Sequence, residues 1–298
     1  MYFNSMSKVL YIAGDGRSGS TLLEGVLTNV KDSISVGECN RFWSRYYTSN
    51  YSILCGCGEL MQKCPHWSAV DGVLSNEIEN YDPERVLDGA KKFTNFSSAK
   101  NLSDHDQNPD YRYLQSVVGK FYAANHAVSG AGTVVDSSKS PGWGLLLLHN
   151  DTVDPKYIHL ERDLASVASS WKKELVLPQH IGKEVYMPIR SDANILRTWL
   201  RVKALCQLLP DTITLRFKYL DLEQRLFAYL DAVRDLAQVE ISQPLVWNDN
   251  HAIAGNPARR NSGEPIRVKP TIQSTSNLSR LQKTYFQIVD RLANRIMK

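Results

Sequence analysis

Four short apolar runs along the chain end in glycine or polar residues, as buried strands do where they lead into loops. The first run leads into a glycine-rich stretch, and the others lead into Asp-Ser-Ser-Lys, Glu-Arg-Asp and Lys-Tyr-Leu. The runs cover residues 8–13, 133–135, 157–160 and 213–217. Helical periodicity precedes or follows each run, so the pattern predicts short strands that alternate with helices.

Amphipathic stretches predict the helices. Pro109 suits the first position of one helix, and Pro210 stops another that Ser191 or Asp192 caps. The predicted helices cover residues 21–30, 109–128, 164–173, 192–209, 221–238 and 277–298.

This alternation predicts a parallel sheet covered on both faces. We expect an α/β fold of three layers, α/β/α, with a central and mostly parallel sheet and with ligands at the carboxyl ends of its strands. No Pro/Gly/Ser-rich linker or charged run divides the chain, so one domain is expected over residues 7–298. Three irregular stretches are candidate lids or acceptor-site loops, and the first and last are expected as insertions: residues 40–75, 95–108 and 175–190.

Composition excludes some classes of protein. With 43% hydrophobic and 22% charged residues, the chain has the balance of a soluble globular protein. A formal net charge of +4 is too small to indicate a nucleic-acid partner, which requires a basic face. No apolar run reaches the roughly 20 residues of a membrane span, and the N-terminus has no signal-peptide pattern, so the cytoplasm is the expected location. The oligomeric state is not readable from the sequence.

Five cysteines are an odd number for a set of disulfides, and a cytoplasmic chain keeps its thiols reduced. Cys55, Cys57 and Cys64 are close in sequence, with Cys39 upstream and His66 beside them. Their spacing differs from the C-x2-C pairs of structural zinc sites. We therefore favour a tight, partly buried turn, with a metal site or a disulfide as alternatives.

Residues 14–21 have the sequence GDGRSGST and match a nucleotide phosphate-binding loop, except that Ser20 replaces its lysine. Glycines let successive backbone N–H groups point toward an anion, and the helix that starts near Ser20 adds its positive end. Arg17, inside the loop, can supply the missing cation. The loop therefore predicts anion binding.

Arg162 follows the apolar run 157–160, and Ser170 lies eight residues later in a predicted helix. Arginine offers a bidentate grip and serine a hydroxyl, so the pair suits a phosphate group. If the glycine loop were absent, we would instead expect Arg162 to form a surface salt bridge and Ser170 to lie on a solvated helix face.

Taken in chain order, several segments resemble motifs of the bacterial type of sulfotransferases that depend on 3′-phosphoadenosine-5′-phosphosulfate (PAPS). Residues 16–23 resemble the family's 5′-phosphosulfate loop, and residues 160–171 resemble its 3′-phosphate motif. Residues 135–141 resemble the segment with a lysine near the sulfuryl group, and residues 251–259 the late loop over the nucleotide. The cysteine segment 55–67 resembles a stretch common in bacterial members, which favours a structural role for it.

The resemblance implies which residues bind PAPS and its product, adenosine 3′,5′-bisphosphate. These are Gly16, Arg17, Ser18, Gly19, Ser20, Thr21, Leu22, Arg162, Ser170, Gly255, Asn256 and Arg259. Residues 216–220 read RFKYL where the family has Arg-Tyr-Glu-Asp-Leu, so Phe217 receives no role. The chemistry that the resemblance implies requires no metal.

Sulfuryl transfer moves a polarised group in line between two oxygens, so cations and hydrogen-bond donors matter most. The resemblance places Arg17 at the 5′-phosphosulfate and Lys139 at the bridging oxygen. Glu38 is the candidate base for an acceptor hydroxyl or amine, although a shift of one residue would put Cys39 there and a surface role for Glu38 is the alternative. A small-molecule, carbohydrate or lipid acceptor is expected.

Two other functions fit the same loop. A P-loop kinase of a small molecule would have a similar loop, but Ser20 in the lysine position disfavours it. A non-catalytic nucleotide-binding protein could keep the fold without the chemistry.

Overall fold

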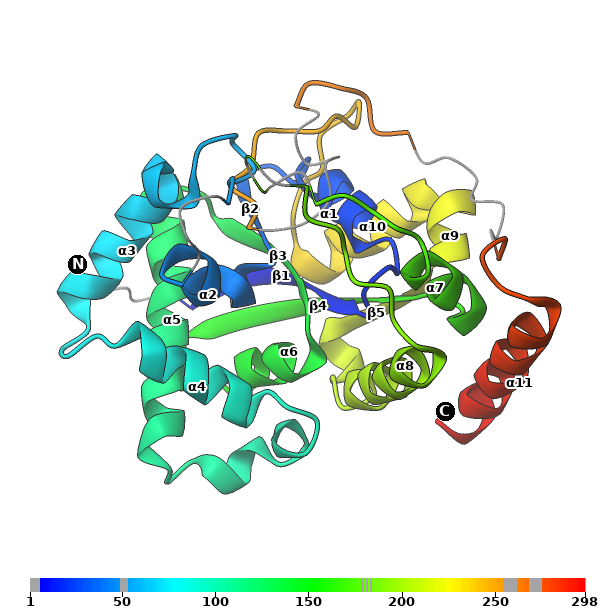
Figure 1. Ribbon diagram of the computed structural model, residues 1–298. Coiled ribbons are helices and arrows are strands. Elements are labelled where there is room, and N and C mark those ends of the chain that lie inside the picture. The colour runs from blue at the N-terminus through cyan, green and yellow to red at the C-terminus, as the bar shows by residue number, and fades with distance from the viewer. Residues whose placement is uncertain are drawn as a thin grey trace.

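The computed structural model describes residues 6–48, 53–177, 180, 182, 184–253, 262–267 and 275–297. In these ranges five strands form one sheet in the order β2-β3-β1-β4-β5, and every neighbouring pair is parallel (Figure 1). The strands are β1 (Ser7–Gly14), β2 (Ser33–Gly37), β3 (Thr133–Lys139), β4 (Val153–Glu161) and β5 (Thr214–Lys218). The expected α/β fold with a parallel central sheet is confirmed.

Helices flank the sheet on both sides. They are α1 (Ser20–Leu27), α2 (Phe42–Tyr46), α3 (Pro65–Glu77), α4 (Pro83–Phe93), α5 (Pro109–Ser129), α6 (Pro141–Leu148), α7 (Leu164–Trp171), α8 (Asp192–Cys206), α9 (Tyr219–Gln224), α10 (Leu226–Ala237) and α11 (Arg280–Ile296). None of the helices in the described ranges is both long enough and apolar enough to cross a membrane.

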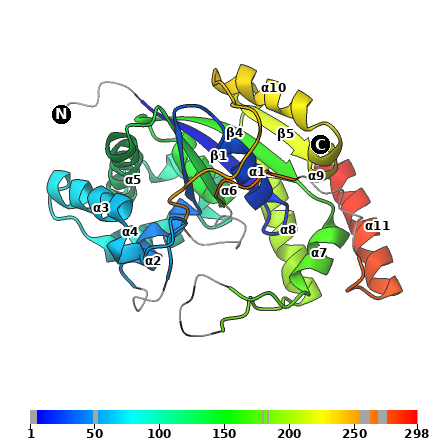
Figure 2. The same ribbon diagram turned by 90° about the horizontal axis from the view of Figure 1, so that it is seen from above.

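The side chains of β1 alternate between two buried clusters, because successive residues of a strand point to opposite faces of the sheet. Val9, Tyr11 and Ala13 join a cluster with residues of α2 to α6. Leu10 and Ile12 join a second cluster with residues of α1, α9 and α10. Figure 2 shows α10 on one side of the sheet and α3, α4 and α5 on the other. Each buried apolar side chain stabilises the fold by about 1.5–3 kcal/mol, so β1 fixes both layers.

A third cluster joins α7, α8 and α11 beside the edge of the sheet that β5 forms (Figure 1). Trp199 of α8 and Phe286 of α11 are buried there against α7. The cluster holds α7, which follows β4, in a fixed position next to the loop after β1.

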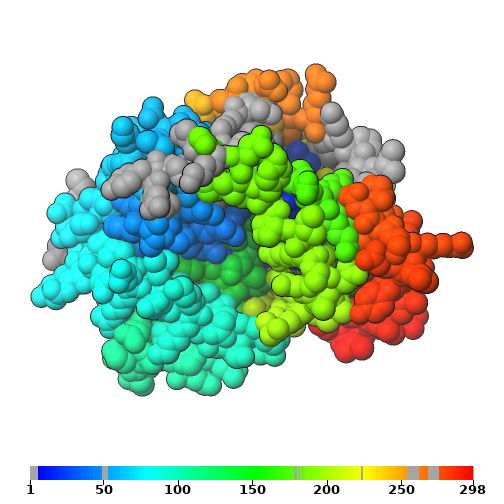
Figure 3. Space-filling view, viewed as in Figure 1, coloured from blue at the N-terminus to red at the C-terminus, as the bar shows by residue number. Residues whose placement is uncertain are grey.

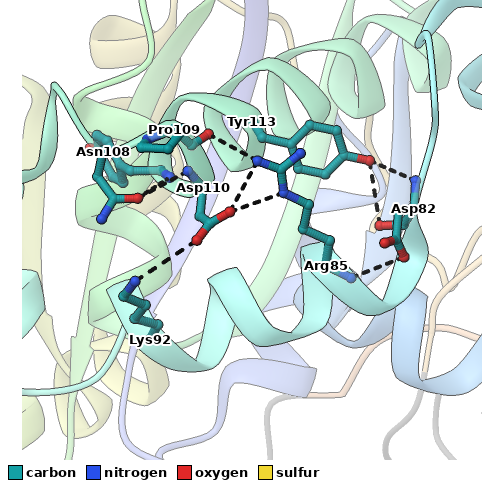
Figure 4. Close-up of polar contacts among 8 residues, drawn as sticks. Asp82, Arg85, Lys92, Asn108, Pro109, Asp110 and Tyr113 are labelled. Atoms are coloured by element: carbon teal, nitrogen blue, oxygen red, sulfur yellow. Dashed lines mark hydrogen bonds and ion pairs between the residues drawn. The ribbon is translucent and has the colours of Figure 1, made fainter.

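The start of α5 is held on α4 by polar contacts (Figure 4). The side chain of Asn108 accepts hydrogen bonds from the backbone N–H groups of Asp110 and Tyr111, and so caps α5. Arg85 of α4 forms an ion pair with Asp110 at 3.0 Å, and its guanidinium lies 4.2 Å from the ring centroid of Tyr113. These contacts fix the layer that covers β3 and β1 from one side.

Several elements differ from the sequence-based expectation, and α4 and α6 were not predicted at all. Residues 40–75 were expected to be irregular, but they contain α2 and α3; Pro65 begins α3 at a position where a missing N–H group does no harm. The single helix expected over 221–238 is two helices, because the backbone at Arg225 is not helical, with φ −135° and ψ 34°. Strand β2 was not predicted, because Ser33 and Ser35 interrupt the apolar run that marks the other strands.

Candidate active site

The glycine loop connects β1 to α1 in the order that the sequence predicts. Within residues 14–20 the backbone φ is positive at Gly14 (152°), Arg17 (73°) and Gly19 (96°). A Cβ atom on Gly14 would lie 2.6 Å from a backbone carbonyl oxygen of β4, and one on Gly19 would lie 2.2 Å from the ring of Tyr219. Only glycine fits both positions, so the close approach of the neighbouring strand and of Tyr219 explains the sequence of the loop.

The loop also contains buried polar atoms that no described residue satisfies. Ser18 is only 1% exposed, and its Oγ has no hydrogen-bond partner among the described residues. The same holds for Nε of Arg17 and for Oδ2 of Asp15. A buried polar group without a partner destabilises a protein by about 1–3 kcal/mol. The two donors among these atoms, the Ser18 hydroxyl and Arg17 Nε, therefore favour a bound anion, whereas the Asp15 oxygen is an acceptor and does not. Because the N-terminus of α1 adds its positive end, the loop fits a phosphate or sulfate group.

Arg17 shares an aromatic platform with a second arginine that the sequence did not single out. The guanidinium of Arg17 lies 5.2 Å from the ring centroid of Trp171, and that of Arg190 lies 3.6 Å from the same ring. Arg17 also contacts the sulfur of Met187. Burial, and next the positive charge of Arg190, lower the pKa of Arg17. An anion between the two guanidinium groups would relieve their repulsion.

Arg162 meets the glycine loop directly. Its Nη1 donates a hydrogen bond of 2.8 Å to the carbonyl oxygen of Arg17, and its guanidinium lies 4.8 Å from the ring centroid of Tyr219. Ser170 precedes Trp171 in α7, and a Cβ atom on Gly16 would lie 2.7 Å from the Trp171 ring. The two candidate anion clamps of the sequence analysis therefore lie side by side in the structure.

Lys139 and Glu38 form an ion pair at the end of the neighbouring strand. Lys139 ends β3, where the register pairs it with Ala13 of β1, and its Nζ donates to Oε1 of Glu38 at 2.6 Å. Arg41 binds the other carboxylate oxygen of Glu38 at 3.0 Å. The side chains of Lys139 and Glu38 are only 17% and 10% exposed, so the pair interacts in a poorly hydrated setting.

Cys39, the alternative to Glu38, lies in a different environment. It is fully buried, and its Sγ lies 3.0 Å from Oδ2 of Asp136 and 3.3 Å from the hydroxyl of Tyr122. Burial raises the pKa of the Cys39 thiol well above its usual value. Between these two neighbours in sequence, only Glu38 has the contact with Lys139.

Cations surround this part of the molecule. Arg45 is close enough to Glu38 and Arg41 for both to influence its pKa, which burial lowers. Burial raises the pKa of Asp15 to about 6, although the hydrogen bond from the Gly16 N–H group and the positive charges of Arg190 and Lys139 lower it. Arg41 lies just before α2, and Arg190 lies just before α8. Figure 3 shows the surface hollowed between the blue segment that contains α2 and the yellow-green segment that contains α8.

Some expected site residues cannot be placed, and others were missed. Gly255, Asn256 and Arg259 lie outside the described residues. Arg190 and Tyr219 were missed, because the first lies in a stretch without periodicity and the second falls two residues beyond the position where the family motif has its tyrosine. Only their packing on Trp171 and Gly19 identifies them.

No protein-family model matches the sequence, and no curated protein matches it. Among solved structures, the sulfotransferase domain of the Synechococcus PCC 7002 olefin synthase is similar to this chain, with a TM-score of 0.50, 14% identity, and coverage of 96% of this chain and 94% of that domain. The chain has a sulfotransferase fold. A sulfotransferase domain from the curacin biosynthetic pathway gives a TM-score of 0.48 and 16% identity over 96% of this chain and 98% of its own. Sulfotransferase STF9 of Mycobacterium avium gives a TM-score of 0.43 and 13% identity, with coverage of 80% of this chain and 65% of that protein.

Proposed function

We propose that the chain is a sulfotransferase that takes the sulfuryl group from PAPS and releases adenosine 3′,5′-bisphosphate. The observation that carries the proposal is the position of the Lys139–Glu38 pair. It lies at the end of β3, next to the strand that leads into the glycine loop, so an anion cradle and an acid–base pair adjoin. A sulfotransferase fold supports the same conclusion.

In this proposal the residues of the chain bind the two ends of PAPS and stabilise the charge that develops during transfer. The loop N–H groups, Ser18 and Arg17 hold the 5′-phosphosulfate, and Arg162 with Ser170 holds the 3′-phosphate. Lys139 moves away from Glu38 and toward the bridging oxygen between sulfur and phosphorus, which becomes more negative as its bond to sulfur breaks.

Release from Lys139 leaves Glu38 able to accept the proton of the acceptor hydroxyl or amine. The bond from the acceptor atom to sulfur forms as the bond from sulfur to the bridging oxygen breaks. The arginines and Lys139 stabilise the negative charge that spreads during this transfer. In line with these roles, a small-molecule, carbohydrate or lipid acceptor would enter from the side of Glu38.

Nucleotide preference tests the proposal. At 100 times its Kd, a ligand stabilises the folded protein by about 2.7 kcal/mol, which raises the melting temperature of a protein of this size by roughly 5 °C. Adenosine bisphosphate should produce this shift, and magnesium ATP should not. A larger shift with magnesium ATP would indicate a kinase. Binding of adenosine bisphosphate without transfer of label from PAPS to any of a broad panel of acceptors would indicate a non-catalytic protein.

A further inference from the structure

Four potential metal ligands from distant parts of the chain converge next to β2. They are the thiols of Cys55, Cys57 and Cys64 and the imidazole of His251, and their ligand atoms all lie within 4.8 Å of one another. The sequence pattern favours a turn without metal, because the cysteine spacing is not a standard one and the histidine nearest in sequence is His66. The fourth ligand instead comes from almost 190 residues further along the chain.

Three of the distances between these atoms are close to those of tetrahedral zinc. With Zn–S bonds of about 2.3 Å and a Zn–N bond of about 2.0 Å, a tetrahedron places two sulfurs about 3.8 Å apart and a sulfur about 3.5 Å from the nitrogen. Here Cys57 Sγ and Cys64 Sγ lie 3.7 Å apart. Nδ1 of His251 lies 3.3 Å from Cys64 Sγ and 3.9 Å from Cys55 Sγ.

The backbone around the cysteines forms a tight turn that brings the thiols together. Leu54 and Leu60 form an antiparallel bridge, and the N–H group of Cys55 donates to the carbonyl oxygen of Glu59 at 2.8 Å. Gly58 has φ 91° at the tip, where the left-handed backbone favours glycine. The N–H group of Cys64, which precedes α3, donates to the carbonyl oxygen of Leu60 at 2.8 Å. The thiols are therefore held in place by hydrogen bonds of the backbone.

Other contacts position the ring of His251. It stacks on His66, with ring centroids 4.6 Å apart, and Trp67 Nε1 donates to the His251 carbonyl oxygen at 2.9 Å. Nε2 of His66 lies 2.9 Å from Oδ1 of Asn125, so this histidine supports the ring of His251 and does not belong to the ligand set. The stack and the hydrogen bond to its carbonyl oxygen fix where the His251 ring lies.

We propose that Cys55, Cys57, Cys64 and His251 bind a structural Zn²⁺ ion. Three thiolates and one imidazole in a tetrahedron are a preferred zinc set, and four protein ligands leave no open position for catalysis. Cys55 and Cys64 are buried, whereas Cys57 is exposed and gives the ion a route from solvent. The proposal does not depend on the proposed activity.

The ion would connect the cysteine turn to the segment that positions Glu38. The N–H group of His251 donates to the carbonyl oxygen of Ser35, and that of Glu38 donates to Ile253 at 3.0 Å. Gly56 also donates to Ala252 at 3.0 Å. Loss of the metal would therefore loosen the backbone on which the candidate base stands.

Metal analysis of the purified full chain tests the site. Elemental analysis after growth with added zinc should give about one zinc per chain, and Cys64→Ser and His251→Ala should each lower this to less than about one fifth. Cys206→Ala is the matched control, because Cys206 is buried at the end of α8 as a free thiol outside the ligand set, and it should keep the full zinc content. A strong chelator should lower the melting temperature of the wild type and of this control.

A measurement on the wild-type protein guards against variants that fail to fold. Co²⁺ added after mild removal of zinc should give the intense visible bands of a tetrahedral site and thiolate-to-cobalt absorption in the near ultraviolet, which zinc should then remove. Wild-type protein with no zinc and no such cobalt spectrum would overturn the proposal. So would iron in place of zinc, a disulfide among the three cysteines in protein purified under reducing conditions, or full zinc content in Cys64→Ser.

Discussion

Gly19→Ala tests whether the glycine loop is shaped by the approach of Tyr219. Gly19 has φ 96° and ψ 9°, and an added Cβ atom would lie 2.2 Å from the Tyr219 ring. The left-handed backbone disfavours alanine by about 1–2 kcal/mol, and the overlap adds about 1–3 kcal/mol. The free energy of unfolding should therefore fall by about 2–5 kcal/mol, and binding of adenosine bisphosphate should weaken because the N–H groups of the loop move.

Urea unfolding and calorimetric titration measure the two effects. Gly72→Ala is the matched control, because Gly72 lies inside α3 with nothing within 4 Å of its would-be Cβ; it should stabilise the protein by about 0.5–1 kcal/mol and leave binding unchanged. Adding Tyr219→Ala to Gly19→Ala should remove the overlap and leave the backbone effect, so the pair should couple by about 1–3 kcal/mol. If Gly19→Ala unfolds at the wild-type midpoint and binds nucleotide normally, the loop does not have this shape.

Two further predictions concern charge. Lys139→Met should lower kcat with PAPS about 10²–10³-fold and Glu38→Gln about 10²–10⁴-fold. Each variant should keep the fold but melt at a lower temperature, because it leaves one partner of a poorly hydrated ion pair. Lys120→Met, which breaks only an exposed pair with Glu77, is the control, and near-normal turnover of either site variant would contradict the assignment. Burial raises the pKa of Asp15 from 3.8 to about 6, so the fold prefers its protonated form, and its contribution to stability is complete below about pH 4 and is lost as the pH rises through about 6. Asp15→Asn should remove this loss. The difference between the free energies of unfolding of the variant and the wild type, measured with urea, should therefore change by about 3 kcal/mol between about pH 3.5 and pH 7. A difference that stays constant over this range would refute the prediction.

The candidate site combines local and distant features. The glycine loop was readable, because a strand, a glycine-rich turn and a helix start are encoded by neighbouring residues. The contact of Arg162 with the Arg17 carbonyl oxygen crosses between two strands. Arg190 lies in a stretch without periodicity, so only its stacking on Trp171 identifies it as a residue of the candidate site. Functional residues at the ends of strands can be predicted once the strands themselves are predicted. Functional residues in loops cannot, because their positions depend on how the loops pack against the rest of the protein.

The sequence alone determined the class of fold, because apolar runs with helices between them can bury their side chains only in a parallel sheet covered on both faces. It did not determine α3 or β2, whose stability comes mainly from packing on elements far away in the chain. Nor could it place His251 beside three cysteines, since that meeting depends on hydrogen bonds between residues 251–253 and the end of β2. Local periodicity reports which face of an element is buried, but only tertiary packing decides which distant side chains share a site.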